Sequence, residues 1–260
     1  MDHEGGAVPV EQSSLRTLRP AEMMATGDTL VAVSRQAVTS VAISVEFVGG
    51  TVIAFAYDTP NGNRPDKNDN YVHVWPVSAN SVPFGSKTDA CAKILGNKPC
   101  GDQSLQTEIT IGAYVVGYAV GPKAPDNTWS PFVNVVASAY IPPAGIRSDP
   151  DGSRTSSIET RFIGQNTLVF RYTFLAGFDP KAANAWVGLW KGEASPYDSR
   201  PRWFAPITLT TSTGDAALDG LQLADGTSYT LALFASGFSM HAKELQLERL
   251  ASTVVFDGGT

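Results

Sequence analysis

The sequence is poor in charge, cysteine and histidine, and it lacks long apolar runs. Only 17% of its 260 residues are charged, and it has 2 Cys and 3 His. The cysteine count excludes a disulfide-stapled miniprotein, and a hydrophobic fraction of 43% excludes a disordered chain. No run approaches the ~18 apolar residues of a membrane-spanning helix, and the start, MDHEGGAVPVEQSS, lacks the basic and apolar regions of a secretion signal. We therefore expect no transmembrane segment and a cytoplasmic location, with export by another route left open.

Positive charge is also scarce. The chain has 19 Lys and Arg against 25 Asp and Glu, a formal net charge of -6, and its cations form no cluster. Nucleic acids and anionic membrane surfaces are bound through clustered cations that neutralise phosphates. Neither is therefore an expected partner.

What the sequence does contain is an internal repeat. The segment VEFVGGTVIAFAYDTPNGNRPDKNDNYVHVWPVSA, starting at Val45, aligns without a gap with TRFIGQNTLVFRYTFLAGFDPKAANAWVGLWKGEA, starting at Thr160, at an offset of 115 residues. The offset returns near the end of each half, whereas the middles, roughly 80–110 and 195–225, lose the match. A register kept over this length favours duplication over chance similarity. The identical pairs include Phe47 with Phe162, Gly49 with Gly164, Phe55 with Phe170, Tyr57 with Tyr172, Gly62 with Gly177, Pro65 with Pro180, and Trp75 with Trp190.

The repeat predicts the domain boundaries. Repeat one covers residues 41–143 and repeat two residues 156–260. Between them, residues 144–155 are rich in Pro, Gly, Ser and Asp, which is typical of a linker. Residues 1–40 form an N-terminal arm without a counterpart before repeat two. We expect the arm either to pack on the interface between the repeats or to add a strand to repeat one.

Both repeats show the period of two that is typical of β-strands. In TVIAFAYD the larger residues Ile53, Phe55 and Tyr57 alternate with smaller ones, and NTLVFRYTF has the same pattern. Several short strands separated by turn residues indicate antiparallel β-sandwiches. The predicted fold class is all-β, with two tandem, internally duplicated sandwiches.

The stretch NAWVGLWK, from Asn184 to Lys191, resembles the D-W-I-G-L-F/Y-K-V stretch of SKICH-type immunoglobulin-like modules. The resemblance covers about thirty residues of each repeat, 162–191 and more faintly 47–76. It implies immunoglobulin-like sandwiches in which the strand carrying Trp186 and Trp190 packs in or beside the core. It also implies a role in interaction or targeting. Repeat one has Tyr-Val-His where Trp-Ile-Gly would stand, so no binding residue is carried over.

The residues that bind zinc are too scattered for a zinc site. His3, His73 and His241 form no H-x-x-x-H pattern, and Cys91 and Cys100 form no C-x-x-C pair. Glycine-rich phosphate loops are also missing, so we expect no cofactor. For the two cysteines the sequence leaves two interpretations open, a disulfide closing a small loop or two free thiols.

Calcium binding is a separate hypothesis that rests on one loop. Asp66, Asn68 and Asn70 supply oxygen ligands at alternating positions, as at the start of an EF-hand loop. Tyr71 and Val77 stand where that loop needs its Gly and its bidentate Glu. The other interpretation is a solvated turn that uses Asp and Asn for local hydrogen bonds.

Nucleophilic catalysis has little support. Ser239 and His241 would share a face of a strand, but a triad also needs an acid and oxyanion donors, and Glu244 is the one acid nearby. The closing Gly of a G-x-S-x-G elbow is missing. We therefore interpret this stretch as a polar loop and expect a protein that is not an enzyme.

The candidate binding patch comes from an unmatched tryptophan. Trp129 lies in the loop GPKAPDNTWSPF, where repeat two has no Trp, and a loop Trp is suited to stacking on a sugar or docking on a partner. The alternative is that Trp129 caps the hydrophobic core or fills the interface between the repeats. In a sandwich this loop would lie at the same end as the loop 58–70. The predicted ligand-binding residues are therefore Arg64, Asp66, Asn68, Asp69 and Trp129, with Trp203 as a further candidate at the interface between the repeats.

Three functional hypotheses follow from the sequence. The leading one is a non-catalytic protein that binds a small molecule, glycan or protein partner through end loops and the crevice between the repeats. The second is a cofactor-free enzyme, of a cyclase or isomerase type, acting on a hydrophobic small molecule in a pocket between the sandwiches. The third is a self-assembling structural subunit, because exposed edge strands can pair into a homo-oligomer.

Overall fold

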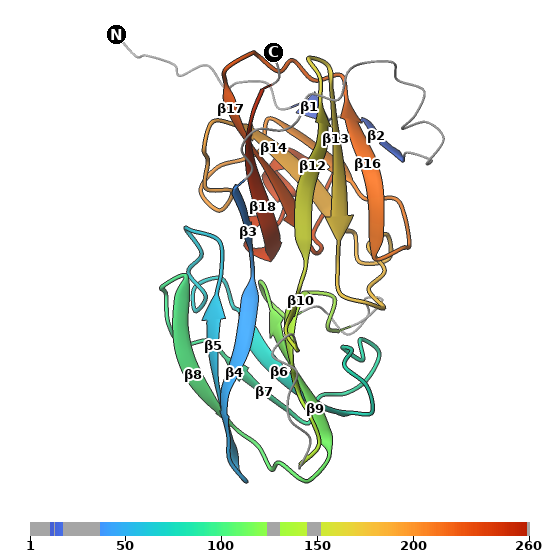
Figure 1. Ribbon diagram of the computed structural model, residues 1–260. Coiled ribbons are helices and arrows are strands. Elements are labelled where there is room, and N and C mark those ends of the chain that lie inside the picture. The colour runs from blue at the N-terminus through green and yellow to red at the C-terminus, as the bar shows by residue number, and fades with distance from the viewer. Residues whose placement is uncertain (1–10, 13, 18–36, 124–130, 145–151, 259–260) are drawn as a thin grey trace.

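The computed structural model describes residues 11–12, 14–17, 37–123, 131–144 and 152–258 of the chain (Figure 1). Over these residues every regular element is a β-strand apart from two short 3-10 helices, η1 (Ala242–Glu244) and η2 (Leu247–Arg249). The prediction of an all-β fold with antiparallel sheets is confirmed. Neither helix of the described part is long and apolar enough to cross a membrane.

The first sandwich lies in the lower half of Figure 1. The inward side chains of β5, Ile53, Phe55 and Tyr57, are buried because every second residue of that strand faces the core. One sheet has the order β4 (Ala42–Val48), β5 (Val52–Asp58), β8 (Cys100–Gln106). The facing sheet has the order β11 (Arg154–Thr155), β10 (Val135–Ile141), β9 (Ala113–Ala119), β6 (Tyr71–Val77), β7 (Ala90–Lys93).

The second sandwich lies in the upper half of Figure 1. Its β13 has the same alternation, with Leu168, Phe170 and Tyr172 buried. One sheet has the order β12 (Ser157–Ile163), β13 (Thr167–Thr173), β16 (Thr213–Asp219), β2 (Ser14–Thr17). The facing sheet has the order β1 (Glu11–Gln12), β15 (Trp203–Pro206), β14 (Trp186–Lys191), β17 (Ser228–Phe234), β18 (Leu250–Asp257), β3 (Ala37–Ser40).

The strands recur along the chain at two offsets. β5 and β13 begin at Val52 and Thr167, which are 115 residues apart. β8 and β16 begin at Cys100 and Thr213, which are 113 residues apart. The middle of each half, where the sequences lose their match, therefore has equivalent strands at a shift of two residues.

Matching hydrogen bonds accompany the matching strands. The indole Nε1 of Trp75 donates to the carbonyl of Ser86, and that of Trp190 donates to the carbonyl of Ser199, both at 3.1 Å. The two bonds connect positions that are equivalent at these offsets. They allow each residue of one sandwich to be compared with its counterpart in the other.

The segment that begins each sandwich is first bonded to the last strand of the other one. β3 pairs with β18 of the second sandwich before the chain continues into β4 of the first. β11 pairs with β10 of the first sandwich before the chain continues into β12 of the second. The amide of Val41 donates to the carbonyl of Ala251 at 3.0 Å, and that of Ser156 to Val136 at 2.8 Å. The sandwiches are therefore joined through two equivalent crossings.

The N-terminal arm adds its strands to the second sandwich. β1 pairs with β15 and β2 pairs with β16. The expectation of an added strand on repeat one is therefore wrong in its location. The reason is the crossing: residues before β3 arrive from the second sandwich. Of the predicted linker, Arg154 and Thr155 form β11, and residues 145–151 lie outside the described residues.

Trp186 and Trp190 of β14 pack in a second apolar cluster beside the main core. The ring of Trp186 stacks on Phe234 with centroids 3.8 Å apart. Leu245 and Leu247, from the segment that carries η1 and η2, are buried in the same cluster. This segment therefore covers the outer face of the six-stranded sheet.

Side chains fill the interface between the sandwiches at the positions where the two halves meet. Arg249 Nη1 donates to Asn134 Oδ1 at 2.5 Å and to Ser236 Oγ at 3.1 Å, and Ser236 Oγ donates to Asn134 Oδ1 at 2.8 Å. Between the two sandwiches, the ring centroids of Phe84 and Phe178 also lie 5.6 Å apart in an edge-to-face arrangement. These contacts occupy the region that the sequence analysis assigned to a binding crevice.

Replacing Asn134 with Ala should destabilise the protein by about 2–3 kcal/mol, because a buried guanidinium then loses its principal acceptor. Urea unfolding of the full chain measures the change, with Asn61→Ala as the control, since Asn61 is exposed. An unchanged midpoint for Asn134→Ala would show that this cluster does not support the interface.

Candidate functional site

The loop between β5 and β6, residues 59–70, carries most of the predicted site residues. Its backbone folds by local hydrogen bonds, from the amide of Asn68 to the carbonyl of Arg64 and from that of Asn70 to Pro65, both at 2.8 Å. Asp69 has a left-handed φ of 51°, which Asp and Asn tolerate better than most residues. The equivalent Asn184 of the second sandwich has a φ of 56°. Both sandwiches therefore build the same loop backbone.

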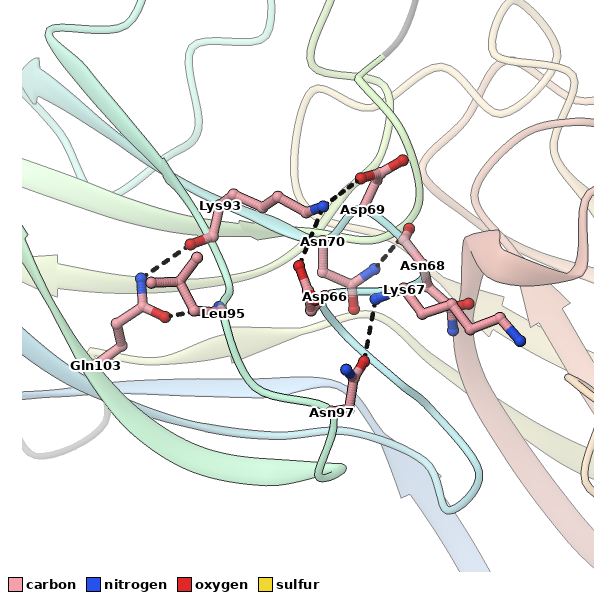
Figure 2. Close-up of polar contacts among 9 residues, drawn as sticks. All are labelled: Asp66, Lys67, Asn68, Asp69, Asn70, Lys93, Leu95, Asn97 and Gln103. Carbon is pink, nitrogen blue, oxygen red and sulfur yellow. Dashed lines mark hydrogen bonds and ion pairs between the residues drawn. The ribbon is translucent and has the colours of Figure 1, made fainter.

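Two of the predicted residues share one cation (Figure 2). Lys93, at the end of β7, lies with Nζ 3.1 Å from Asp66 Oδ1 and 2.7 Å from Asp69 Oδ1. The bond to Asp69 and then the bond to Asp66 raise the pKa of Lys93. The two ion pairs connect the loop to β7, which is the neighbour of β6 in the sheet. Arg64 is exposed at the same loop.

The structure gives the three proposed calcium ligands different partners. Asp66 pairs with Lys93, and Asn68 Nδ2 donates to Asn63 Oδ1 at 2.8 Å. Asn70 is fully buried, and its Oδ1 accepts from Asn63 Nδ2 and from the Tyr118 hydroxyl, both at 2.9 Å. Among the described residues no group of three His, Cys, Asp or Glu side chains could hold a metal ion. This geometry offers no support for calcium binding in the loop.

Beneath the loop lies a buried polar network that the second sandwich replaces with apolar groups. Asn63 Nδ2 also donates to Thr59 Oγ1 at 3.1 Å, and Thr59 Oγ1 donates to the Pro99 carbonyl at 2.7 Å. Burial raises the pKa of Tyr118 well above its usual value, so its hydroxyl stays a neutral donor. The equivalent positions of Thr59, Asn63, Asn70 and Tyr118 are Phe174, Phe178, Ala185 and Leu233.

A short segment after β7 presents an exposed leucine next to this loop. Leu95 is 74% exposed. Its amide donates to Gln103 Oε1 at 3.0 Å, and the amide of Lys67 donates to Asn97 Oδ1 at 3.0 Å (Figure 2). Because β8 and the loop both hold the segment, Leu95 cannot fold back into the core without breaking these bonds. We call Asp66, Lys67, Asp69, Lys93, Leu95 and Asn97 the end-loop surface.

The two candidate tryptophans have different outcomes. Trp203 is 1% exposed and belongs to the main hydrophobic core, so it cannot present its ring to a ligand. The flanking Arg202 lies over that ring, with Cζ 4.4 Å from the centroid. The assignment of Trp203 to a binding surface is therefore wrong. Trp129 lies outside the described residues. Its loop starts at the expected end, because Ala119 pairs with Tyr71.

The reactive side chains considered from the sequence do not form a catalytic group. Ser239 Oγ donates to Glu244 Oε2 at 2.7 Å and accepts from the backbone amide of His241 at 3.1 Å. The serine is therefore bonded to a carboxylate and not to the imidazole. Cys91 and Cys100 are both free and exposed.

Sequence reasoning missed Lys93, Leu95 and Gln103. Lys93 is distant in sequence from the two carboxylates that it binds, and Leu95 follows a buried Ile94 in an apolar stretch typical of a core strand. The register of β6 with β7 decides the positions of Lys93 and Leu95, and the register of β5 with β8 decides that of Gln103. The only sequence signal was the poor match between the repeats in this region.

Comparisons with known proteins add little about function. No protein-family model and no curated protein matches the chain. Among solved structures, the chain is similar to one described as "Biofilm associated protein - BSP domain", at 13% sequence identity and a TM-score of 0.20, over 70% of this chain and 24% of that chain. The chain thus spans about a quarter of that structure's length. The resemblance to SKICH-type modules stays a prediction.

His73 is a titratable group outside this surface whose pKa is strongly shifted by burial. It is 2% exposed and lies among aromatic rings, with centroids 5.6 Å from Trp75 and 5.2 Å from Phe132. Burial, and secondarily the charge of Lys123, lower its pKa to about 4.

This shift predicts a pH dependence of stability. Below a pH of about 6.5, His73 of the unfolded chain is protonated. His73 of the folded chain stays neutral until the pH reaches about 4. The free energy of unfolding should therefore fall by up to about 3 kcal/mol between these pH values. His73→Leu should remove this part of the slope in urea titrations, whereas His241→Gln, an exposed control, should keep it. Equal slopes for wild type and His73→Leu would contradict the burial of a neutral imidazole.

Proposed function

We propose that the protein is a non-catalytic binding protein and that the end-loop surface of the first sandwich contacts a protein partner. The support comes from the comparison between its two halves. Both halves form the same backbone bonds, for example from the amide of Asp66 to Gly96 at 2.9 Å and from Lys181 to Leu209 at 3.1 Å. The counterparts of Asp66, Lys67, Asp69, Lys93, Leu95 and Asn97 are Lys181, Ala182, Asn184, Pro206, Thr208 and Thr210.

Apart from Asp69, whose left-handed φ recurs at Asn184, the fold therefore does not need these side chains. A chain that forms this backbone with Ala182 and Thr208 could form it with the same residues in the first sandwich. Leu95 is hydrated in the folded chain much as it is in the unfolded chain, so folding gains nothing from this side chain. We take binding as the reason for an exposed leucine beside an ion-paired rim.

The chemistry of the surface suits a protein partner. Leu95 supplies an apolar anchor, and Lys93 with Asp66 and Asp69 supplies a charged rim of both signs. Protein interfaces combine such a centre with such a rim, in which the central contact contributes most of the affinity. The exposed thiols Cys91 and Cys100 support a reducing compartment, and we propose the cytoplasm. We further propose that the halves are duplicated immunoglobulin-like sandwiches, on the recurrence of strands and bonds.

The interface between the sandwiches supports neither a binding crevice nor an enzyme pocket at the positions described above. Arg249 and Asn134 are 6% and 2% exposed there, and Phe84 and Phe178 are in ring contact. The proposed function therefore keeps the end loop of the leading hypothesis and drops the crevice.

Arrays of folded protein domains, peptides and glycans, probed with the full chain, test this proposal. A protein or peptide partner should lose at least about tenfold in affinity with Leu95→Glu, because a charge replaces the apolar anchor. The matched variant Thr208→Glu alters the counterpart in the second sandwich and should bind as the wild type does. Partners that bind Leu95→Glu unchanged, or binding confined to glycans, would refute the proposal.

A further inference from the structure

The second sandwich has a strand-docking seat that the chain itself fills. The arm segment, residues 11–12 and 14–17, pairs in parallel with β15 at Glu11↔Trp203 and antiparallel with β16 at Leu15↔Leu218. It therefore spans from the edge of one sheet to the edge of the facing sheet. Figure 1 shows β2 beside β16 in the upper sandwich.

The first sandwich has the same two edges without a strand on them. β7 and β8 are the counterparts of β15 and β16, and each is the last strand of its sheet in the described part of the chain. β8 forms an outer edge of the lower sandwich in Figure 1. We call the outer edges of β7 and β8 the open seam. An unpaired edge carries backbone donors and acceptors that a further strand can satisfy.

One side chain bridges the open seam. Gln103 lies opposite Phe55 on β5, and Phe55 is buried, so Gln103 also points between the sheets. Its Nε2 donates to the Lys93 carbonyl at 2.9 Å, and its Oε1 accepts from the Leu95 amide. The counterpart of Gln103 is Ala216, which pairs with Thr17 of the arm segment. These two hydrogen bonds join β8 to the end of β7 on the inner side of the seam. They do not use the backbone N–H and C=O groups on the outer edge of β8.

The seam also carries an unneutralised charge. In the second sandwich, Asp215 accepts two hydrogen bonds from Arg171, at 2.9 and 2.7 Å. In the first sandwich the cross-strand pair is Ala56↔Asp102, so the counterpart of Arg171 has no charge. Asp102 is exposed and has no ion-pair partner among the described residues.

We propose that the open seam binds an extended segment of another protein, paired antiparallel with β8. That segment has an apolar residue opposite Leu105 and, three positions later, a Lys or Arg opposite Asp102. The arm segment supplies the register, because Leu15 lies opposite Leu218, the counterpart of Leu105. Edge pairing gives the affinity, and these two side chains give the specificity.

The arm of a second copy fits less well. It would have to leave β15 and β16 of its own copy. The hydrogen bonds formed on β7 and β8 would then only replace those lost on β15 and β16. A foreign strand has no such loss. This inference goes beyond the proposed function, because it uses the sheet edges and does not depend on the end-loop surface.

The probe is a synthetic peptide of residues 11–19 in which Leu18 is replaced by Lys, EQSSLRTKR. Continuing the register of Thr17, that lysine lies opposite Asp102. Fluorescence anisotropy with the full chain should show saturable binding. A copy of the peptide that is N-methylated at alternate residues cannot pair along an edge and should not bind.

A charge swap locates the binding. Asp102→Lys should weaken the affinity for the peptide about threefold, the size expected of an exposed ion pair. A peptide with Glu in place of that lysine should recover the lost affinity for this variant. Asp225→Lys, an exposed carboxylate in the second sandwich, serves as the control and should change neither peptide. Leu95→Glu should leave the peptide affinity unchanged, which separates this inference from the proposed function.

Several results would overturn the inference. One is the absence of saturable binding, and another is equal binding of the N-methylated peptide. A third is an affinity that does not change with the charge at position 102, because the peptide would then bind to the second sandwich. Sedimentation of the chain alone as a dimer that Asp102→Lys dissociates would also overturn it, because a second copy would then occupy the seam.

Discussion

Backbone groups at the outer edge of a β-sheet have no hydrogen-bond partner within that sheet, and the way the chain covers such edges organises the molecule. The last strand of each sandwich receives a short strand from a crossing segment, β3 on β18 and β11 on β10. The crossings bring the N-terminal arm to the second sandwich, where β1 and β2 cover two further edges. One arm serves one of two equivalent seats, so the halves differ at β7 and β8.

The same asymmetry appears inside the loops. The first sandwich supports its 59–70 loop with a satisfied polar network around Asn63 and Asn70, where the second stacks Phe174 on Phe178 with centroids 4.4 Å apart. A satisfied buried network fixes a unique geometry, whereas apolar packing of the same shape gains more from burial. The first sandwich thus has a rigid polar loop beside open edges. The second is closed at the equivalent places, and for this reason we propose that the recognition surfaces lie on the first.

The sequence was informative where structure follows local periodicity. Alternation in β5 and β13 gave the strands, and the offset of 115 residues in the sequence matches the spacing between the first residues of these two strands. It failed where partners are distant, since Ser14 pairs with Asp219 and Lys93 binds Asp66. It also misplaced Trp203, which was a candidate at the interface between the repeats, whereas β15 turns its ring into the core. Such positions depend on strand register, which composition and spacing do not encode.

In the described part of the chain, the outer edge of β8 in the first sandwich has no strand on it, whereas β2 covers the equivalent edge of β16 in the second. Amide hydrogen exchange of the full chain, resolved by residue over 100–106 and 213–219, tests this difference directly. Alternate amides of β8 should exchange far faster than their neighbours, whereas the amides of residues 216–219 in β16, which pair with β13 on one side and with β2 on the other, should all be protected. Equal protection of every amide in both strands would contradict the account, because β8 would then have a partner on its outer edge.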